Sequence, residues 1–250
     1  GLEADAARTA GDQYNLARQI VGIHRAILGR TRPAALASAA MEEVFASAGV
    51  AVVALFPVVD PIGNTPWFIA ATRNSSPDER RRQALHGVLI SIAMLIGFLV
   101  AGSLILDFFG VSLAAVEFVG GLVIGWVGWE MLSAKPSRDT TDEQVPAGDA
   151  DIALSPLAFP LLAGPGALAI ALGLSNRHET AADYVGFALG IIVVMAICFL
   201  ILTRAGAVVA RLGPRGIDVI NGAMGLIVLA IGAELVFNGI SDFFGLTIVS

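Results

Sequence analysis

The feature that most constrains this chain is a series of six long stretches with almost no charge. They cover residues 44–71, 87–106, 113–132, 152–176, 184–203 and 217–240. A helix needs about 20 apolar residues to cross about 30 Å of hydrocarbon. Backbone amides inside a bilayer must be satisfied within the segment or bundle, which favours helices here. The alternation typical of a membrane barrel is absent. We therefore expect an all-α membrane protein with six transmembrane helices.

The composition agrees with this expectation and excludes several classes of protein. Of 250 residues, 56% are hydrophobic and 14% charged, whereas soluble domains carry about 25% charge. The 15 basic residues are outnumbered by 21 acidic ones, so we expect no nucleic-acid partner. The single cysteine, Cys198, lies in an apolar run and is predicted to be a packed, inert thiol. We find no ATP-binding motif and no metal-ligand spacing, and we expect no cofactor, no metal site and no enzymatic activity.

The basic residues of the loops predict the orientation in the membrane. If loops alternate between the two faces, one face carries Arg73, Arg80, Arg81, Arg82, Lys135, Arg138, Arg204, Arg211 and Arg215. The other carries Arg30, Arg32 and Arg177. The richer face is expected in the cytoplasm, which places both termini outside an inner membrane of bacterial type.

The two halves of the chain repeat each other. Phe56-Pro57 recurs as Phe159-Pro160, and the four residues from Gly121 recur from Gly225. Each unit holds three spans, an odd number, so the second copy is expected to be inverted. Inverted repeats are typical of secondary transporters.

This repeat divides the chain into four parts. Residues 1–41 form an extension, either flexible or an amphipathic surface helix. Residues 42–134 are the first three-helix repeat, and residues 152–250 are the second. Residues 135–151 are polar, contain two prolines, and are expected to be a cytoplasmic linker.

The first span of each repeat is interrupted by proline and glycine. The interruptions read FPVVDPIGNTP at 56–66 and FPLLAGPGA at 159–167. An interior proline costs a helix about 3 kcal/mol, and both interruptions fall near the middle of their stretches. We therefore expect helices 1 and 4 to be broken near the midplane, with the freed backbone groups lining a cavity.

These interruptions offer binding groups of both signs. Asn64 or Thr65 can cap a new helix ahead of Pro66, and Gly164-Pro165 can start another. Helix starts present amides to a carboxylate, while carbonyls ending the preceding half, near residues 58–59, suit an ammonium group or a cation. This pairing matches a zwitterion such as a small neutral amino acid, although a metal ion or a small anion would use the same parts.

Asp60 is the strongest single candidate for a functional residue. It is the only charge in the first stretch, where a buried charge costs about 3 kcal/mol. As a functional residue it would hold a substrate ammonium group or carry a coupling proton. As a structural residue it would accept hydrogen bonds from the amides of Gly63 and Asn64 and shape the break.

Other polar residues inside the spans are candidates for coupling or gating. Glu130 and Glu234 lie near the ends of their spans, where an interfacial position is the alternative to a gating role. Glu117 and Asn221 occupy matching repeat positions and could bond across helices. The coupling or gating candidates are Asp60, Glu130, Glu234 and Asn221.

The interrupted segments at 56–68 and 156–168 resemble the two signature segments of the MarC family, also called the UPF0056 membrane proteins. The segment 220–240 is similar to that family's last helix, and the resemblance covers about residues 42–245. The family in turn resembles the LysE-like group of amino-acid exporters. The candidates for substrate binding are Asp60, Pro61, Gly63, Asn64, Thr65, Pro66, Gly164, Pro165 and Gly166.

This resemblance implies a six-helix inner-membrane protein, in a family of which some members transport small neutral amino acids such as glycine, alanine and threonine. We therefore expect a secondary transporter of this class, with coupling to a proton or sodium through Asp60 and the exposed carbonyls. Two alternatives stay open. The cargo is another small metabolite or a drug, or the protein is a membrane scaffold or regulatory partner without transport. The oligomeric state is not predicted.

Overall fold

The computed structural model describes residues 33–133, 152–177 and 180–245, and all regular secondary structure in these ranges is helical. The elements are α2 (Pro33–Val59), α3 (Asn64–Ala71), α4 (Pro77–Phe109), α5 (Leu113–Ser133), η1 (Ala153–Leu162), α6 (Pro165–Arg177), α7 (Ala181–Thr203) and α8 (Ala205–Phe244). The whole predicted linker, residues 135–151, lies outside the described residues. The predicted extension does too, except for residues 33–41, which begin α2. The arrangement described below concerns residues 44–245.

The helices agree with a membrane protein of many spans. Five of them are long and apolar enough to cross a bilayer, and the count rises to six when η1 and α6, bent by 62° at their junction, are taken as one broken span. The stretch Ser38–Val59 satisfies the length and hydropathy of a span by itself. The midplane position of the first break, at residues 60–63, therefore stays a prediction.

Two helices extend beyond the apolar stretches that predict them. Helix α4 begins at Pro77 because Ser76 caps it, accepting a hydrogen bond from the Glu79 amide. Helix α8 begins at Ala205 and changes direction at Gly213-Pro214 before the predicted span starts. Hydropathy detects the apolar part of a helix, whereas caps and turns decide where the helix begins.

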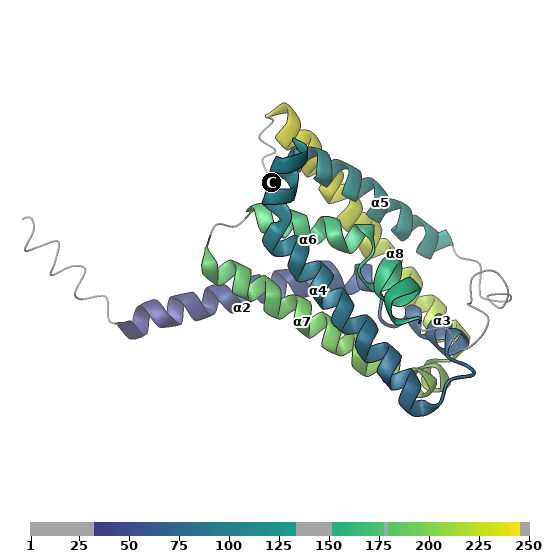
Figure 1. Ribbon diagram of the computed structural model, residues 1–250. Coiled ribbons are helices and arrows are strands. Elements are labelled where there is room, and N and C mark those ends of the chain that lie inside the picture. Colours follow the sequence, from purple (N-terminus) through teal and green to yellow (C-terminus); the bar gives the residue numbers. More distant parts are fainter. Residues whose placement is uncertain (1–32, 134–151, 178–179, 246–250) are drawn as a thin grey trace, which may run out of the picture. The chain divides into compact units, whose positions relative to one another are not determined.

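Helices α5 and α8 pack along their lengths through a seam of small residues (Figure 1). A Cβ atom on Gly121 would lie 2.6 Å from the carbonyl oxygen of Gly232, and one on Gly128 would lie 2.8 Å from that of Gly225. The helices are antiparallel, because residues with higher numbers on α5 face residues with lower numbers on α8. The seam residues, Ala114, Gly121 and Gly128 facing Gly239, Gly232 and Gly225, recur every seven positions. Small residues at such spacing allow backbones of membrane helices to approach closely.

The core lies where α4 contacts η1, α6 and α7. Its fully buried side chains include Leu95, Leu99, Phe187, Ile191 and Met195. Cys198 is also fully buried, which agrees with a packed thiol. Helix α6 lies between α4 and α5, so the second break is held by two neighbouring helices (Figure 1).

Candidate functional site

The first break is a four-residue turn between Val59, which ends α2, and Asn64, which begins α3. Asp60 adopts a left-handed backbone conformation with φ of 44°, which is uncommon for a residue other than glycine. Its carbonyl oxygen accepts a hydrogen bond from the Asn64 amide at 3.1 Å. The predicted interruption of the first span is therefore present, with Asp60 at its start.

The carboxylate of Asp60 has two different environments. Its Oδ1 accepts a hydrogen bond from the Gly63 amide at 3.0 Å. A Cβ atom on Gly63 would overlap the other oxygen, Oδ2, and would lie 2.9 Å from the side-chain oxygen of Asn221 on α8. The predicted hydrogen bond from the Gly63 amide to the Asp60 carboxylate is thus confirmed. Because Gly63 has no side chain, the side chains of Asp60 and Asn221 can both lie beside it.

The side chains of Asn64 and Thr65 do not cap α3 as predicted. Gly63 precedes α3 without a side-chain cap. The Asn64 side-chain amide instead donates to the Val59 carbonyl at 2.8 Å, and the Thr65 hydroxyl donates to the Ile62 carbonyl at 2.6 Å. The prediction that Asn64 or Thr65 caps α3 with Pro66 in first place is therefore wrong, and the Val59 carbonyl already has a donor. The Asn64 side chain thus folds back to the end of α2 and the Thr65 hydroxyl to the turn itself, which the sequence alone does not reveal.

The second break is less regular than expected. In η1, Ser155 and Phe159 have extended backbone conformations, so the segment before the break is a series of wide turns. Its last turn closes through a hydrogen bond from the Ala163 amide to the Ala158 carbonyl at 2.8 Å. The regular helix α6 then begins at Pro165, as predicted. The expected first half-helix is thus replaced by irregular turns, because prolines recur within it.

The two breaks lie next to each other through apolar atoms. A Cβ atom on Gly166, the second residue of α6, would lie 3.3 Å from a methyl carbon of Val58 on α2 and 2.8 Å from Ile124 on α5. A polar side chain from outside the first break, Asn221 of α8, lies beside Gly63. The two breaks themselves approach each other at Val58 and Gly166.

The remaining candidates are distributed over the molecule. Pro61 is buried within the first turn. Glu130 and Glu234 are exposed on α5 and α8, and their interfacial position stays a prediction. Glu117 is buried, and its carboxylate lies 3.9 Å from the Cβ position of Gly173 on α6. Glu117 and Asn221 therefore face α6 and the first break, respectively.

One polar cluster was not anticipated from the sequence. The Ser47 hydroxyl on α2 donates to a carboxylate oxygen of Asp183 on α7, and the Thr180 hydroxyl donates to the other at 2.8 Å. Thr180 also caps α7 by accepting from the Asp183 amide at 3.1 Å. The spacing of Thr180 and Asp183 is a helix-start signal in the sequence. Nothing in the sequence pairs them with Ser47.

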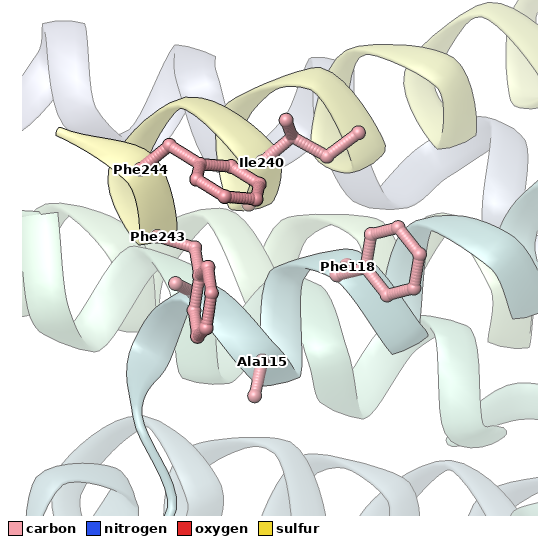
Figure 2. A pocket seen from close by; sticks show the side chains of 7 residues that line it. Ala115, Phe118, Ile240, Phe243 and Phe244 are labelled. Carbon is pink, nitrogen blue, oxygen red and sulfur yellow. The ribbon is translucent and has the colours of Figure 1, made fainter. Parts of the chain in front are cut away.

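Apolar grooves lie along α5. One of about 300 Å³ is formed where α5 begins and α8 ends, and Figure 2 shows Phe118, Ile240 and Phe243 among the side chains around it. Another, of about 340 Å³, lies between α5 and α6 and reaches Pro165. Their linings suit hydrocarbon. The polar side chains Asp60 and Asn221 do not line these grooves.

Comparison with known proteins agrees with this architecture. The model of the MarC family, described as integral membrane proteins, matches residues 45–244. The UPF0056 membrane protein YvbG of Bacillus subtilis (strain 168) is 32% identical over 196 residues, 77% of this chain and 93% of the relative. The UPF0056 inner membrane protein MarC of Escherichia coli O1:K1 is 28% identical over 215 residues, 81% of this chain and 97% of the relative. No solved structure matches this chain.

The spans and their interruptions define an integral membrane protein that crosses the bilayer several times. The chain belongs to the MarC family. An archaeal relative, the UPF0056 membrane protein MJ1677 of Methanocaldococcus jannaschii, is 32% identical over 188 residues, 74% of this chain and 92% of the relative. The Escherichia coli relative is named an inner membrane protein.

Proposed function

We propose that this protein is a secondary transporter of small neutral amino acids of the glycine, alanine and threonine class. The substrate binds at the two interrupted segments and is moved unchanged through the inner membrane, coupled to a proton or sodium. The observation that carries the proposal is the adjacency of the breaks, where Gly166 at the start of α6 faces Val58 at the end of α2. Irregular backbone inside a membrane protein is tolerated where it is buried in protein or lines a cavity.

The two breaks supply complementary chemistry for a zwitterion. The first contains the carboxylate of Asp60. The second opens α6, where the amides of Gly166 and Ala167 precede the first hydrogen bond of the helix, from the Leu168 amide to the Gly164 carbonyl. A helix start favours an anionic group such as a substrate carboxylate. An amino acid would thus be bound at opposite ends by opposite partial charges.

The packing also supports an arrangement of two inverted repeats. At an offset of 104 residues, Gly121 and Gly128 correspond to Gly225 and Gly232. These four glycines meet across the α5–α8 seam, Gly121 against Gly232 and Gly128 against Gly225. If the two repeats exchange places, each pair of facing glycines is replaced by the other pair. This is the pattern expected when the two helices are antiparallel and related by a two-fold axis.

Contacts outside the seam follow the same exchange. Helix α5 packs on α6, and its repeat counterpart α8 packs on α3. Glu117 on α5 faces α6, and Asn221, at the matching position of α8, faces the first break. Each repeat thus places a polar side chain beside the broken helix of the other. Transporters built in this way alternate access by rocking one repeat against the other.

Transport by the purified protein tests the proposal. The full chain is reconstituted into liposomes, and the flux of labelled glycine, alanine and threonine is measured under imposed proton and sodium gradients. We expect saturable flux of at least one of these amino acids that depends on one gradient. Flux no greater than that of empty liposomes for all three would contradict the proposal.

A further inference from the structure

We propose that the Asp60 carboxylate and the Asn221 side-chain oxygen together bind the ammonium group of the transported amino acid. This inference rests on the proposed function and assigns one end of the substrate to two residues. Asp60 belongs to the first repeat, whereas Asn221 is supplied by α8 of the second.

The geometry places two acceptor oxygens beside the same glycine. A Cβ atom on Gly63 would overlap Asp60 Oδ2 and lie 2.9 Å from Asn221 Oδ1, so both oxygens border the space that this glycine leaves open. The other carboxylate oxygen of Asp60, Oδ1, already accepts a hydrogen bond from the Gly63 amide. Asp60 Oδ2 on the turn and Asn221 Oδ1 on α8 therefore border the same space from two different elements.

One of these two oxygens, Asn221 Oδ1, is buried and lacks a donor among the described residues. Asp60 forms no ion pair in the described part of the chain. The donors of the turn are committed elsewhere, since the Asn64 side chain donates to Val59 and the Thr65 hydroxyl to Ile62. Buried acceptors in native proteins are normally satisfied, so a donor from outside the chain is indicated.

The chemistry of the pair favours an ammonium group. An ammonium carries three N–H donors and a positive charge. Two of these donors match the Asp60 carboxylate oxygen and the Asn221 amide oxygen. Divalent metal cations take about six oxygen ligands, and the nearby Val59 and Ile62 carbonyls already accept hydrogen bonds. An uncharged donor would leave the carboxylate without a counter-charge inside an apolar segment.

Binding measurements on the full chain in lipid nanodiscs test this assignment. Alanine, propionate and ethylamine are titrated by calorimetry into the unaltered protein and into Asn221→Leu, which keeps the size of the side chain and removes its oxygen. Asn238→Leu is the matched control, because it makes the same change elsewhere on α8. We expect alanine to bind about tenfold or more weakly to Asn221→Leu and unchanged to Asn238→Leu. Propionate, which lacks the amine, should not bind.

The outcomes separate this inference from the proposed function. If alanine binds the unaltered protein and Asn221→Leu equally well, the ammonium assignment is overturned while transport of amino acids stands. The assignment is likewise overturned if Asn221→Leu changes only the dependence on sodium. If neither glycine, alanine nor threonine binds the unaltered protein, the proposed function fails, and the assignment fails with it.

A second variant keeps the test decisive if Asn221→Leu does not fold. Asn221→Asp retains the shape of the side chain and adds a negative charge beside Asp60. We expect ethylamine, a cation without a carboxylate, to bind this variant more tightly than the unaltered protein. An unchanged or weaker affinity for ethylamine would overturn the assignment.

Discussion

Ser47 on α2 donates a hydrogen bond to the carboxylate of Asp183 on α7, which is 6% exposed. The contact lies beside Gly186, where a Cβ atom would approach the Val44 carbonyl oxygen to 2.6 Å. At an offset of 104, Thr180 and Asp183 correspond to Ser76 and Glu79, which form the same kind of helix cap at the start of α4. Glu79 is exposed. The two repeats therefore share the cap but differ in the environment of its carboxylate.

Removing the Ser47 hydroxyl should destabilise the protein. Ser47→Ala leaves one oxygen of the buried Asp183 carboxylate without this donor, and we expect a loss of about 1–3 kcal/mol. Thermal unfolding in detergent measures the change. Ser103→Ala, on the exposed side of α4, is the control and should unfold at nearly the original temperature. Equal unfolding temperatures for both variants would show that the hydrogen bond contributes nothing.

The glycine seam should not tolerate even one methyl group. In Gly232→Ala the new Cβ would lie 2.5 Å from the Gly125 amide nitrogen and 2.8 Å from the Gly121 carbonyl oxygen. Separating the backbones should cost about 1–3 kcal/mol. Gly222→Ala on the same helix meets no atom within 4 Å, and it should be neutral or stabilise by up to about 1 kcal/mol. Unfolding temperatures of the two variants check the prediction, and a harmless Gly232→Ala would contradict the packing of α5 on α8.

Gly63→Ala should impair transport more than stability. Its Cβ would overlap Asp60 Oδ2 and push it from Asn221, at a turn where the remaining contacts are local. Gly49→Ala on α2 has open space around the new atom and serves as the control. We expect flux in liposomes to fall at least tenfold for Gly63→Ala, an order-of-magnitude figure for the loss of one charge-assisted hydrogen bond. Equal flux for the two variants would argue against a site at this turn.

Asp60→Asn tests whether this carboxylate couples transport to protons. The amide keeps the shape of the side chain but can neither take up nor release a proton in the range of pH 5 to about 8. If Asp60 carries the coupling proton, the flux of the variant no longer responds to an imposed pH gradient. Glu130→Gln and Glu234→Gln, both at exposed positions, should respond as the unaltered protein does. A pH response of Asp60→Asn equal to the original would refute the coupling role.

Gly166→Leu separates transport from a scaffold role. A leucine at this position would collide with Ile124 and with Val58 across the junction of the two breaks. We expect the variant to reach the membrane in reduced amount and to lose flux per inserted molecule. The amount of inserted protein is measured together with the flux, so that flux per molecule is compared between the variant and the unaltered protein. If a cellular phenotype of the gene survives Gly166→Leu, a scaffold or regulatory role becomes the better explanation.

The sequence by itself determined that the chain has several long apolar spans, and it located both interruptions. These properties depend on local composition, because a long uncharged stretch suits the interior of a bilayer, and closely spaced prolines and glycines disfavour a continuous helix. The start of α6 at Pro165 could be predicted for the same reason. The match between Gly121 and Gly225 was also visible in the sequence.

Only the tertiary structure decided which side chains meet. It placed Asn221 against the turn at Asp60, turned the Asn64 side chain back to the Val59 carbonyl, and joined Ser47 to Asp183. Each of these relations depends on how a helix is rotated and how deeply it packs. Contacts along whole helices set the rotation and the depth, and no short segment contains that information.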